Sequence, residues 1–251
     1  MGYFDSPFQA IAHRGGARHP ANIGRENTAR AFQTAVDLGF RYLETDVHAT
    51  RDGRLVAFHD DRLDRVTDLA GKIRELPYDV VAQARVGGDC AVPLMAELLD
   101  RFPQARFNID LKGEGTAPLL AAAIRAAGAQ DRVLVTSFSG RRLAEFRAIM
   151  GDSVPYGAST ADVARSLTAC RLGVGRYPSG VSALQIPLRR NHLQVFSRRL
   201  LDGAHRAGLR VHVWTIDDAD AMNELIEAGV DGIMTDRPDV LRQVLAARGM
   251  W

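Results

Sequence analysis

Two acidic residues, Glu44 and Asp46, lie two positions apart in a segment that reads as a β-strand. The neighbouring Tyr42, Leu43 and Val47 favour a strand, and residues i and i+2 of a strand share one face. Both carboxylates therefore point into one site, where two like charges repel unless a cation lies between them. Because Mg²⁺ and Ca²⁺ prefer oxygen ligands, the pair indicates a divalent-cation site.

The residues that follow predict a hairpin that adds a histidine to this pair. Asp52-Gly53 favours a two-residue turn, and a turn centred there places His59 directly opposite Asp46. Two carboxylates and an imidazole, which can move protons near neutral pH, would then share one short hairpin. The alternative is an exposed hairpin whose polar residues face water.

Strand-like and helix-like segments alternate along the whole chain. Strands are expected at residues 9–13, 106–112, 132–138, 154–158, 182–186, 209–215 and 232–235 besides the hairpin at 41–60, and helices at 29–39, 93–102, 117–127, 141–150, 161–172, 197–207, 219–228 and 239–247. Such alternation implies right-handed crossovers and a parallel sheet. Eight units in 251 residues predict an α/β fold of the (β/α)8 TIM-barrel type. A doubly wound open sheet is the alternative, but no Gly-rich dinucleotide or Walker motif stands at a strand–helix junction.

Residues 60–93 depart from this alternation, because they are polar and have few periodic apolar positions. We interpret them as a short irregular insertion after the second strand. The chain is therefore predicted to form a single TIM-barrel domain over residues 1–251.

Polar residues gather where the predicted strands end, which is where TIM barrels place their active sites. The set comprises His13, Arg14, Glu44, Asp46, His59, Asp110, Lys112 and Trp214. Carboxylates for a cation, cationic groups for an anion and histidines for proton transfer together suit a phosphate ester.

Some members of this set also have a simpler reading. His13 could be a buried core histidine, Lys112 could pair with Asp110, and Trp214 could pack inside the barrel. Asp236, at the end of the last strand, is expected to cap the next helix and is left outside the site.

Composition excludes several other classes of protein. The net charge of +2, without a basic tract, gives no electrostatic footprint for nucleic acid. No apolar run is long enough for a membrane span, and the N-terminus lacks the features of a signal peptide, so no stable membrane anchor is expected. Cys90 and Cys170 suggest neither a disulfide framework nor a metal knuckle, which favours a reducing, cytoplasmic setting. The oligomeric state is not predicted.

The motifs, taken together, resemble those of the glycerophosphodiester phosphodiesterase family, an enzyme family of lipid and glycerol metabolism. They are His13-Arg14-Gly15, Glu26-Asn27-Thr28, Glu44-Thr45-Asp46-Val47, Asp52-Gly53 with Val56, His59-Asp60, and Asn108-Ile109-Asp110-Leu111-Lys112. The tail from Val211 to Pro238 is also similar to the last two units of the family. The likeness is weakest over residues 141–191.

The resemblance implies a TIM-barrel hydrolase that cleaves glycerophosphodiesters, which are small molecules, to glycerol 3-phosphate and an alcohol. It implies Mg²⁺ or Ca²⁺ held by Glu44, Asp46 and Asp110, with His13 and His59 as the acid–base pair. Arg14 and Lys112 would contact phosphate, and Trp214 would shape the glycerol side. The sequence departs from the family at Asp110, where Glu is usual, and in the longer loop before Glu26, where Arg25 replaces a common Pro.

Two other functions remain open for the same fold. A lysophospholipase D would need an apolar groove for an acyl chain, and the sequence shows no exposed apolar cluster after strands four to seven. A non-catalytic barrel that binds glycerophosphodiesters would be expected to lack a metal ligand or a histidine, whereas this chain keeps them all.

Overall fold

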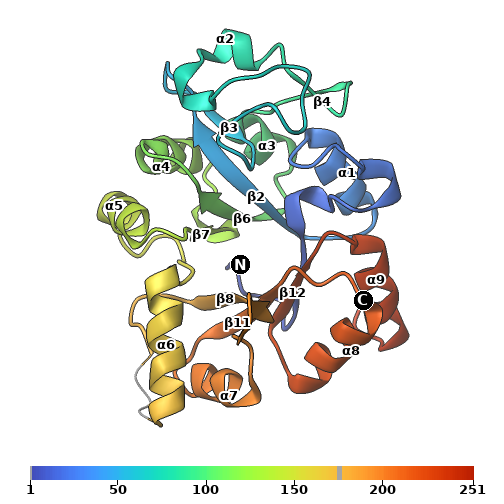
Figure 1. The fold of residues 1–251 in the computed structure, drawn as a ribbon, viewed down its shortest axis with the longest axis vertical. Helices are drawn as coiled ribbons and strands as arrows, with labels where there is room; N and C mark the ends of the chain where they lie inside the picture. Colours follow the sequence, from blue (N-terminus) through green and yellow to red (C-terminus); the bar gives the residue numbers. More distant parts are fainter. Residues whose placement is uncertain (1, 174–176) are drawn as a thin grey trace.

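The computed structural model describes residues 2–173 and 177–251, and its main element is a curled parallel sheet (Figure 1). The strands follow the order β7-β6-β2-β1-β12-β11-β8. They are β1 (Gln9–Ala12), β2 (Tyr42–Ala49), β6 (Arg106–Leu111), β7 (Val133–Thr136), β8 (Ala183–Pro187), β11 (Arg210–Trp214) and β12 (Gly232–Thr235). The α/β class and the parallel sheet predicted from the alternation are confirmed.

The helices lie around the outside of these strands (Figure 1). They are α1 (Ala29–Asp37), α3 (Met95–Arg101), α4 (Thr116–Ala126), α5 (Gly140–Met150), α6 (Thr160–Leu172), α7 (Arg198–Arg206), α8 (Ala219–Ala228) and α9 (Pro238–Ala247). Several begin at a Ser, Thr or Asp whose side chain accepts a hydrogen bond from the backbone of the first turn, which satisfies an otherwise unpaired N–H. Thr28 is the N-cap of α1.

Residues 154–158 lie between β7 and β8, the two strands at the edges of the sheet. Val135 N donates to Pro155 O and Gly157 N donates to Val135 O, while Ala158 N donates to Ala183 O and Ser182 N donates to Tyr156 O. These contacts appear only as isolated parallel bridges, so the strand predicted over residues 154–158 is not formed as a regular strand. The sheet is TIM-barrel-like in its curl, and its closure as an eight-stranded barrel stays a prediction.

The hairpin after β2 has a register different from the predicted one. In the antiparallel pair of β2 and β3 (Leu55–Ala57), Val47 lies opposite Ala57, and Phe58 N donates to Asp46 O. Phe58, not His59, is therefore the residue opposite Asp46. The turn is one residue longer than predicted, because Thr50 pairs with Arg54.

Residues 58–94 form a small substructure with a core of their own. It contains α2 (Tyr78–Val81) and the two-stranded pair β4 (Arg85–Val86) and β5 (Cys90–Ala91), which lie together at the top of Figure 1. Its buried side chains include Phe58, Leu63, Ile73, Val81 and Val92. A second small pair, β9 (Arg189–Arg190) and β10 (Leu193–Gln194), follows β8. None of the helices in the described residues is both long and apolar enough to cross a membrane.

Packing of α1 fixes the strands that carry the predicted site. Phe32 of this helix is fully buried, and its ring meets that of Phe107 of β6 edge-on at 6.0 Å between centroids. Burying one such side chain contributes roughly 1.5–3 kcal/mol to folding. β2 and β6 pair in parallel so that Asp46 lies beside Asp110, which brings carboxylates of two strands together.

Candidate active site

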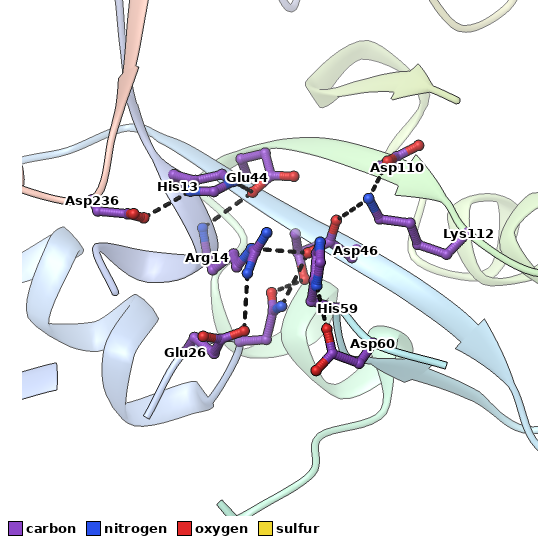
Figure 2. A network of polar contacts seen from close by, with 12 residues as sticks. His13, Arg14, Glu26, Glu44, Asp46, His59, Asp60, Asp110, Lys112 and Asp236 are labelled. Carbon is purple, nitrogen blue, oxygen red and sulfur yellow. Dashed lines mark hydrogen bonds and ion pairs between the residues drawn. The ribbon is translucent and has the colours of Figure 1, made fainter. Parts of the chain in front are cut away.

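All eight residues predicted for the site line one cavity of about 660 Å³. They are His13, Arg14, Glu44, Asp46, His59, Asp110, Lys112 and Trp214. They come from within β2, from the carboxyl ends of β1, β6 and β11 and from the segment after β3. Parallel strands deliver their carboxyl ends to the same side of the sheet. Figure 2 shows most of them together with the polar side chains that they contact.

Three of the side chains that line this cavity are buried carboxylates. Glu44, Asp46 and Asp110 are only 5%, 2% and 6% exposed. Burial, followed by the negative charge of Asp46, raises the pKa of Glu44 to about 7. Burial also raises the pKa of Asp110. A cation close to such buried carboxylates favours their ionised forms.

Lys112 supplies one such positive charge. Its Nζ lies 3.0 Å from Asp46 Oδ1 and 2.8 Å from Asp110 Oδ2. Burial opposes the charged forms of both Lys112 and Asp46, but their attraction outweighs it, so the pKa of Lys112 is raised and that of Asp46 is lowered. Pairing of Lys112 with Asp110, which the sequence left open, is therefore present.

The described residues contain no group of three His, Cys, Asp or Glu side chains arranged closely enough to hold a metal ion. The ammonium of Lys112 lies between two of the three predicted ligands in this arrangement. The donor chemistry nevertheless fits a hard cation, since the set is all-oxygen and buried Asp110 Oδ1 has no hydrogen-bond partner. The assignment of Glu44, Asp46 and Asp110 as metal ligands stays a prediction.

His13 follows β1 directly and is held at Nδ1 by a carboxylate. Its Nδ1 lies 2.7 Å from Asp236 Oδ1, and its Nε2 lies 3.8 Å from Glu44 Oε2. Burial opposes the charged imidazole, but Glu44 and Asp236 outweigh it and raise the pKa of His13. Asp236 thus contacts a predicted catalytic residue. The expectation that it caps α9 is wrong, because Arg237 holds that position without a side-chain hydrogen bond.

His59 follows β3 and reaches the same cavity although it is not opposite Asp46. β3 ends at Ala57, so the backbone is free to leave the ladder before His59. Its Nδ1 lies 2.6 Å from Asp60 Oδ1. Burial is the largest cause of the lowered pKa of His59, and the positive charge of Arg14 adds to it against the opposing effect of Asp46.

Arg14 connects the first two strands of the site. Its backbone N donates to Glu44 Oε2 at 3.1 Å, and its guanidinium contacts Asp46 Oδ2 at 3.4 Å and Glu26 Oε1 at 3.0 Å. The residue has φ 51°, in the left-handed region that non-glycine residues rarely adopt, so these contacts hold a strained backbone. Asn27, from the Glu-Asn-Thr motif, donates to Asp46 Oδ2 at 3.2 Å and fixes that carboxylate.

The far side of the cavity is mainly apolar. Trp214 meets Phe138 edge-on at 5.9 Å, and Lys112 Nζ lies 5.2 Å from the Phe138 ring centroid. Beyond them the wall is made by α6 and the residues around β9 and β10, including Val163, Leu167, Leu193 and Val195, with Arg189 and Arg190 among the lining residues. Phe138 is 51% exposed and Leu193 is 44% exposed. The expectation that no exposed apolar cluster follows the later strands is therefore wrong.

Sequence reasoning missed the groups that hold the site residues in place. Asp236 and Asp60 each contact a histidine, and Glu26 contacts Arg14. A signal for Asp60 was present, since it directly follows His59. Asp236 had a weaker signal, because it ends the last strand, which neighbours the first strand once the sheet curls.

Comparison with known proteins gives one consistent result. Residues 13–240 match the model of the glycerophosphoryl diester phosphodiesterase family. The chain is similar to a probable glycerophosphodiester phosphodiesterase 2 of Mycobacterium tuberculosis (strain ATCC 25618 / H37Rv), with 39% identity over 96% of this chain and 92% of the relative. It is also similar to the lysophospholipase D GDPD1 of Homo sapiens, with 26% identity over 94% of this chain and 85% of that protein.

Solved structures agree with these sequence relatives. The structure of an Oleispira antarctica phosphodiesterase in complex with the product sn-glycerol-3-phosphate matches with a TM-score of 0.76 and 25% identity. The match covers 95% of this chain and 96% of that one.

Proposed function

The chain belongs to the glycerophosphoryl diester phosphodiesterase family and is therefore a phosphoric diester hydrolase, and from this premise we propose how it works. It hydrolyses glycerophosphodiesters to glycerol 3-phosphate and an alcohol, with the aid of a divalent cation. The observation that carries the proposal is that three buried carboxylates, two histidines and two cationic side chains line one cavity.

The carboxylates would bind the cation, and the cationic side chains would bind the substrate. Glu44, Asp46 and Asp110 offer the all-oxygen ligand set that suits Mg²⁺ or Ca²⁺. When bound, the cation would offset negative charge on the phosphoryl oxygens. Arg14 and Lys112 would add hydrogen bonds and positive charge to the same oxygens, where preorganised donors stabilise a transition state.

The two histidines would share the proton transfers. One of His13 and His59 removes a proton from the attacking oxygen, and the other donates a proton to the leaving alkoxide. Each imidazole has a carboxylate on Nδ1, which leaves Nε2 for the reacting groups. Water and the 2-hydroxyl of the glycerol moiety are both chemically suited to attack, the second through a cyclic phosphate. Trp214 would form a wall of the glycerol side.

We also propose that residues 154–158 complete the sheet as the eighth member of a (β/α)8 barrel and that residues 1–251 form one domain. The hydrogen bonds of residues 155–158 to both β7 and β8 support this closure. The insertion at about 60–93 would then be an addition to that barrel with its own small core.

A second candidate activity is lysophospholipase D-type hydrolysis of lysophospholipids. The apolar wall that includes Phe138, Val163, Leu167 and Leu193 supports it, because an acyl chain attached to the glycerol could lie there. Among the relatives, the human protein named lysophospholipase D GDPD1 is consistent with such a substrate.

A substrate panel tests the proposal. Glycerophosphocholine, glycerophosphoethanolamine, glycerophosphoglycerol and lysophosphatidylcholine would be incubated with the protein and Mg²⁺ or Ca²⁺, and the released phosphate monoester identified. We expect His13→Ala and His59→Ala each to lower the rate by about 10²- to 10⁴-fold, the usual cost of losing a proton-transfer group. Replacing Arg14 or Lys112 by Met should lower kcat/KM by about 10²-fold. An active His13→Ala/His59→Ala double variant would contradict the proposal.

A further inference from the structure

Arg65 lies in the insertion after β3, outside the set of residues predicted for the site. Its side chain is 48% exposed, and it contacts two carboxylates from different parts of the chain. One carboxylate is Asp60, and the other is Glu26 from the loop before α1. Each of them in turn contacts a residue that lines the cavity (Figure 2).

The first branch leads from Arg65 to a histidine. Arg65 Nε donates to Asp60 Oδ2 at 2.6 Å, and the other oxygen of Asp60 lies 2.6 Å from His59 Nδ1. Both oxygens of the Asp60 carboxylate are thus occupied, so its plane is fixed. A fixed carboxylate on Nδ1 fixes the orientation of the imidazole ring.

The second branch leads from Arg65 to an arginine. The two terminal nitrogens of Arg65 donate to the two oxygens of Glu26, at 3.0 and 2.6 Å. Glu26 Oε1 also accepts from Arg14 at 3.0 Å. Such a bidentate fork defines direction as well as distance, which an ammonium group cannot reproduce.

Charges alternate along this chain of contacts, from Arg14 through Glu26, Arg65 and Asp60 to His59. Burial opposes the ionised forms of Glu26 and Asp60, but hydrogen bonds from Arg65 outweigh it and lower the pKa of both carboxyls. Ion pairs that involve an exposed side chain add little to the stability of a protein. The main effect of Arg65 should therefore be on geometry at the cavity.

We propose that Arg65 is a positioning residue that sets the orientation of His59 through Asp60 and the placement of Arg14 through Glu26. This inference rests on the proposed function, in which His59 transfers a proton and Arg14 contacts the phosphate. It also gives the insertion a role, because Arg65 fastens it to the loop of the first βα unit through Glu26.

Steady-state kinetics on glycerophosphocholine test this assignment. Arg65→Met should lower kcat/KM by about 10- to 100-fold, since small displacements of reacting groups are costly. The matched control is Arg62→Met, because Arg62 lies in the same insertion and pairs only with Asp64 among its described contacts. The control should stay within twofold of wild type. Arg65→Met kinetics within twofold of the control would overturn the proposal.

The two branches can be separated by their kinetic parameters. Asp60→Asn should mainly lower kcat and Glu26→Gln should mainly raise KM, whereas Arg65→Met should do both. In an Asp60→Asn background, Arg65→Met should no longer lower kcat but should still raise KM. An equal loss of kcat in both backgrounds would show that Arg65 does not act through Asp60 and would overturn the proposal.

Three further variants keep the outcome decisive. If Arg65→Met does not fold, Arg65→Lys decides, because a lysine cannot contact both carboxylates in the same geometry and should lose several-fold in kcat/KM. Wild-type kinetics of Arg65→Lys would then overturn the inference. His59→Ala and Arg14→Met are measured alongside. If they retain full activity, the proposed function fails, and if they are impaired while Arg65→Met is normal, only the role of Arg65 fails.

Discussion

Asp236 holds His13 in a contact that joins the first strand of the chain to the last. An anionic oxygen on Nδ1 selects the tautomer that carries its proton there and stabilises the imidazolium when it forms. We expect Asp236→Asn to lower kcat/KM by about 10²-fold or more, because the amide can present a donor to Nδ1 and favour the wrong tautomer. Asp239→Asn, which alters a surface pair with Arg237, is the control and should have normal kinetics. Equal kinetics of the two variants would contradict this role for Asp236.

Asp110 is the proposed third metal ligand, and its Oδ1 is buried without a hydrogen-bond partner. If it is a metal ligand, its charge matters more than its length. Asp110→Glu should therefore keep substantial activity, whereas Asp110→Asn should lose most of it, as measured by kcat/KM at saturating Mg²⁺. Wild-type activity of Asp110→Asn would remove Asp110 from the ligand set.

Residue spacing was enough to predict which side chains line the cavity, but not which side chains hold them in place. Glu44 and Asp46 could be placed together because i and i+2 share a face of a strand, and parallel strands bring Asp110 and Lys112 beside them. Asp236 and Arg65 could not be placed, since their contacts depend on how the sheet curls and how the insertion folds back. Contacts between residues far apart in the chain produce no periodic pattern of residue types from which they could be predicted.

The hairpin of β2 and β3 shows how one side chain changes the register of an element. Thr50 Oγ1 donates to Asp52 Oδ1 at 2.6 Å and accepts from Arg54 N at 2.9 Å. These bonds close a three-residue loop with Gly53 at φ 78°, in place of the two-residue turn that Asp-Gly favours. A one-residue change of register moves each side chain to the other face, so only the end of β3 at Ala57 lets His59 enter the cavity.

A row of polar side chains crosses the interior of the sheet from β1 to β8. Gln9 Oε1 lies 3.1 Å from His212 Nε2, and Gln185 Nε2 lies 3.1 Å from His212 Nδ1. His212 is fully buried, and burial lowers its pKa to about 4 from 6.5. The imidazole of His212 is therefore uncharged in the folded protein at pH 7.

The lowered pKa of His212 predicts that the stability of the folded protein depends on pH. Between pH 6.5 and about 4 the unfolded chain binds a proton at His212 that the folded chain does not, so stability falls as the pH falls through this window. The loss between pH 7 and pH 4.5 should be about 2–3 kcal/mol. Urea unfolding of His212→Gln should lack this part of the pH dependence, whereas exposed His192→Gln should retain it. Identical pH dependence of wild type and His212→Gln would contradict the prediction.

α6 and the β9–β10 pair supply the apolar wall, so substrate preference should depend on them. Leu167→Ser should lower kcat/KM for lysophosphatidylcholine by about tenfold, because each buried methylene is worth about 0.8 kcal/mol. The same variant should hydrolyse glycerophosphocholine normally, since that substrate has no acyl chain. Thr168→Ala, an exposed neighbour on α6, is the control. If wild-type protein does not hydrolyse lysophosphatidylcholine, the second candidate activity fails.

The whole molecule could be predicted as an α/β fold because its strand–helix alternation is regular, but one segment departs from it. Residues 154–158 include Pro155, which has no N–H to donate, and Gly157, which adds no side chain to the sheet. They make single bridges to β7 and β8 in place of a regular strand. The insertion also differs from expectation, since its polar sequence hides a compact apolar core around Phe58, Leu63 and Ile73.

The proposed function requires a cation at the buried carboxylates, so the dependence of activity on metal tests it most directly. The direct measurement is release of glycerol 3-phosphate from glycerophosphocholine by protein that has been stripped with EDTA and then supplied with Mg²⁺ or Ca²⁺. We expect no product from the stripped protein and full recovery when a cation is restored, with no recovery in Glu44→Gln. Full release of glycerol 3-phosphate by metal-free protein would contradict the proposed cation site, and no release under any of these conditions would contradict the proposed reaction.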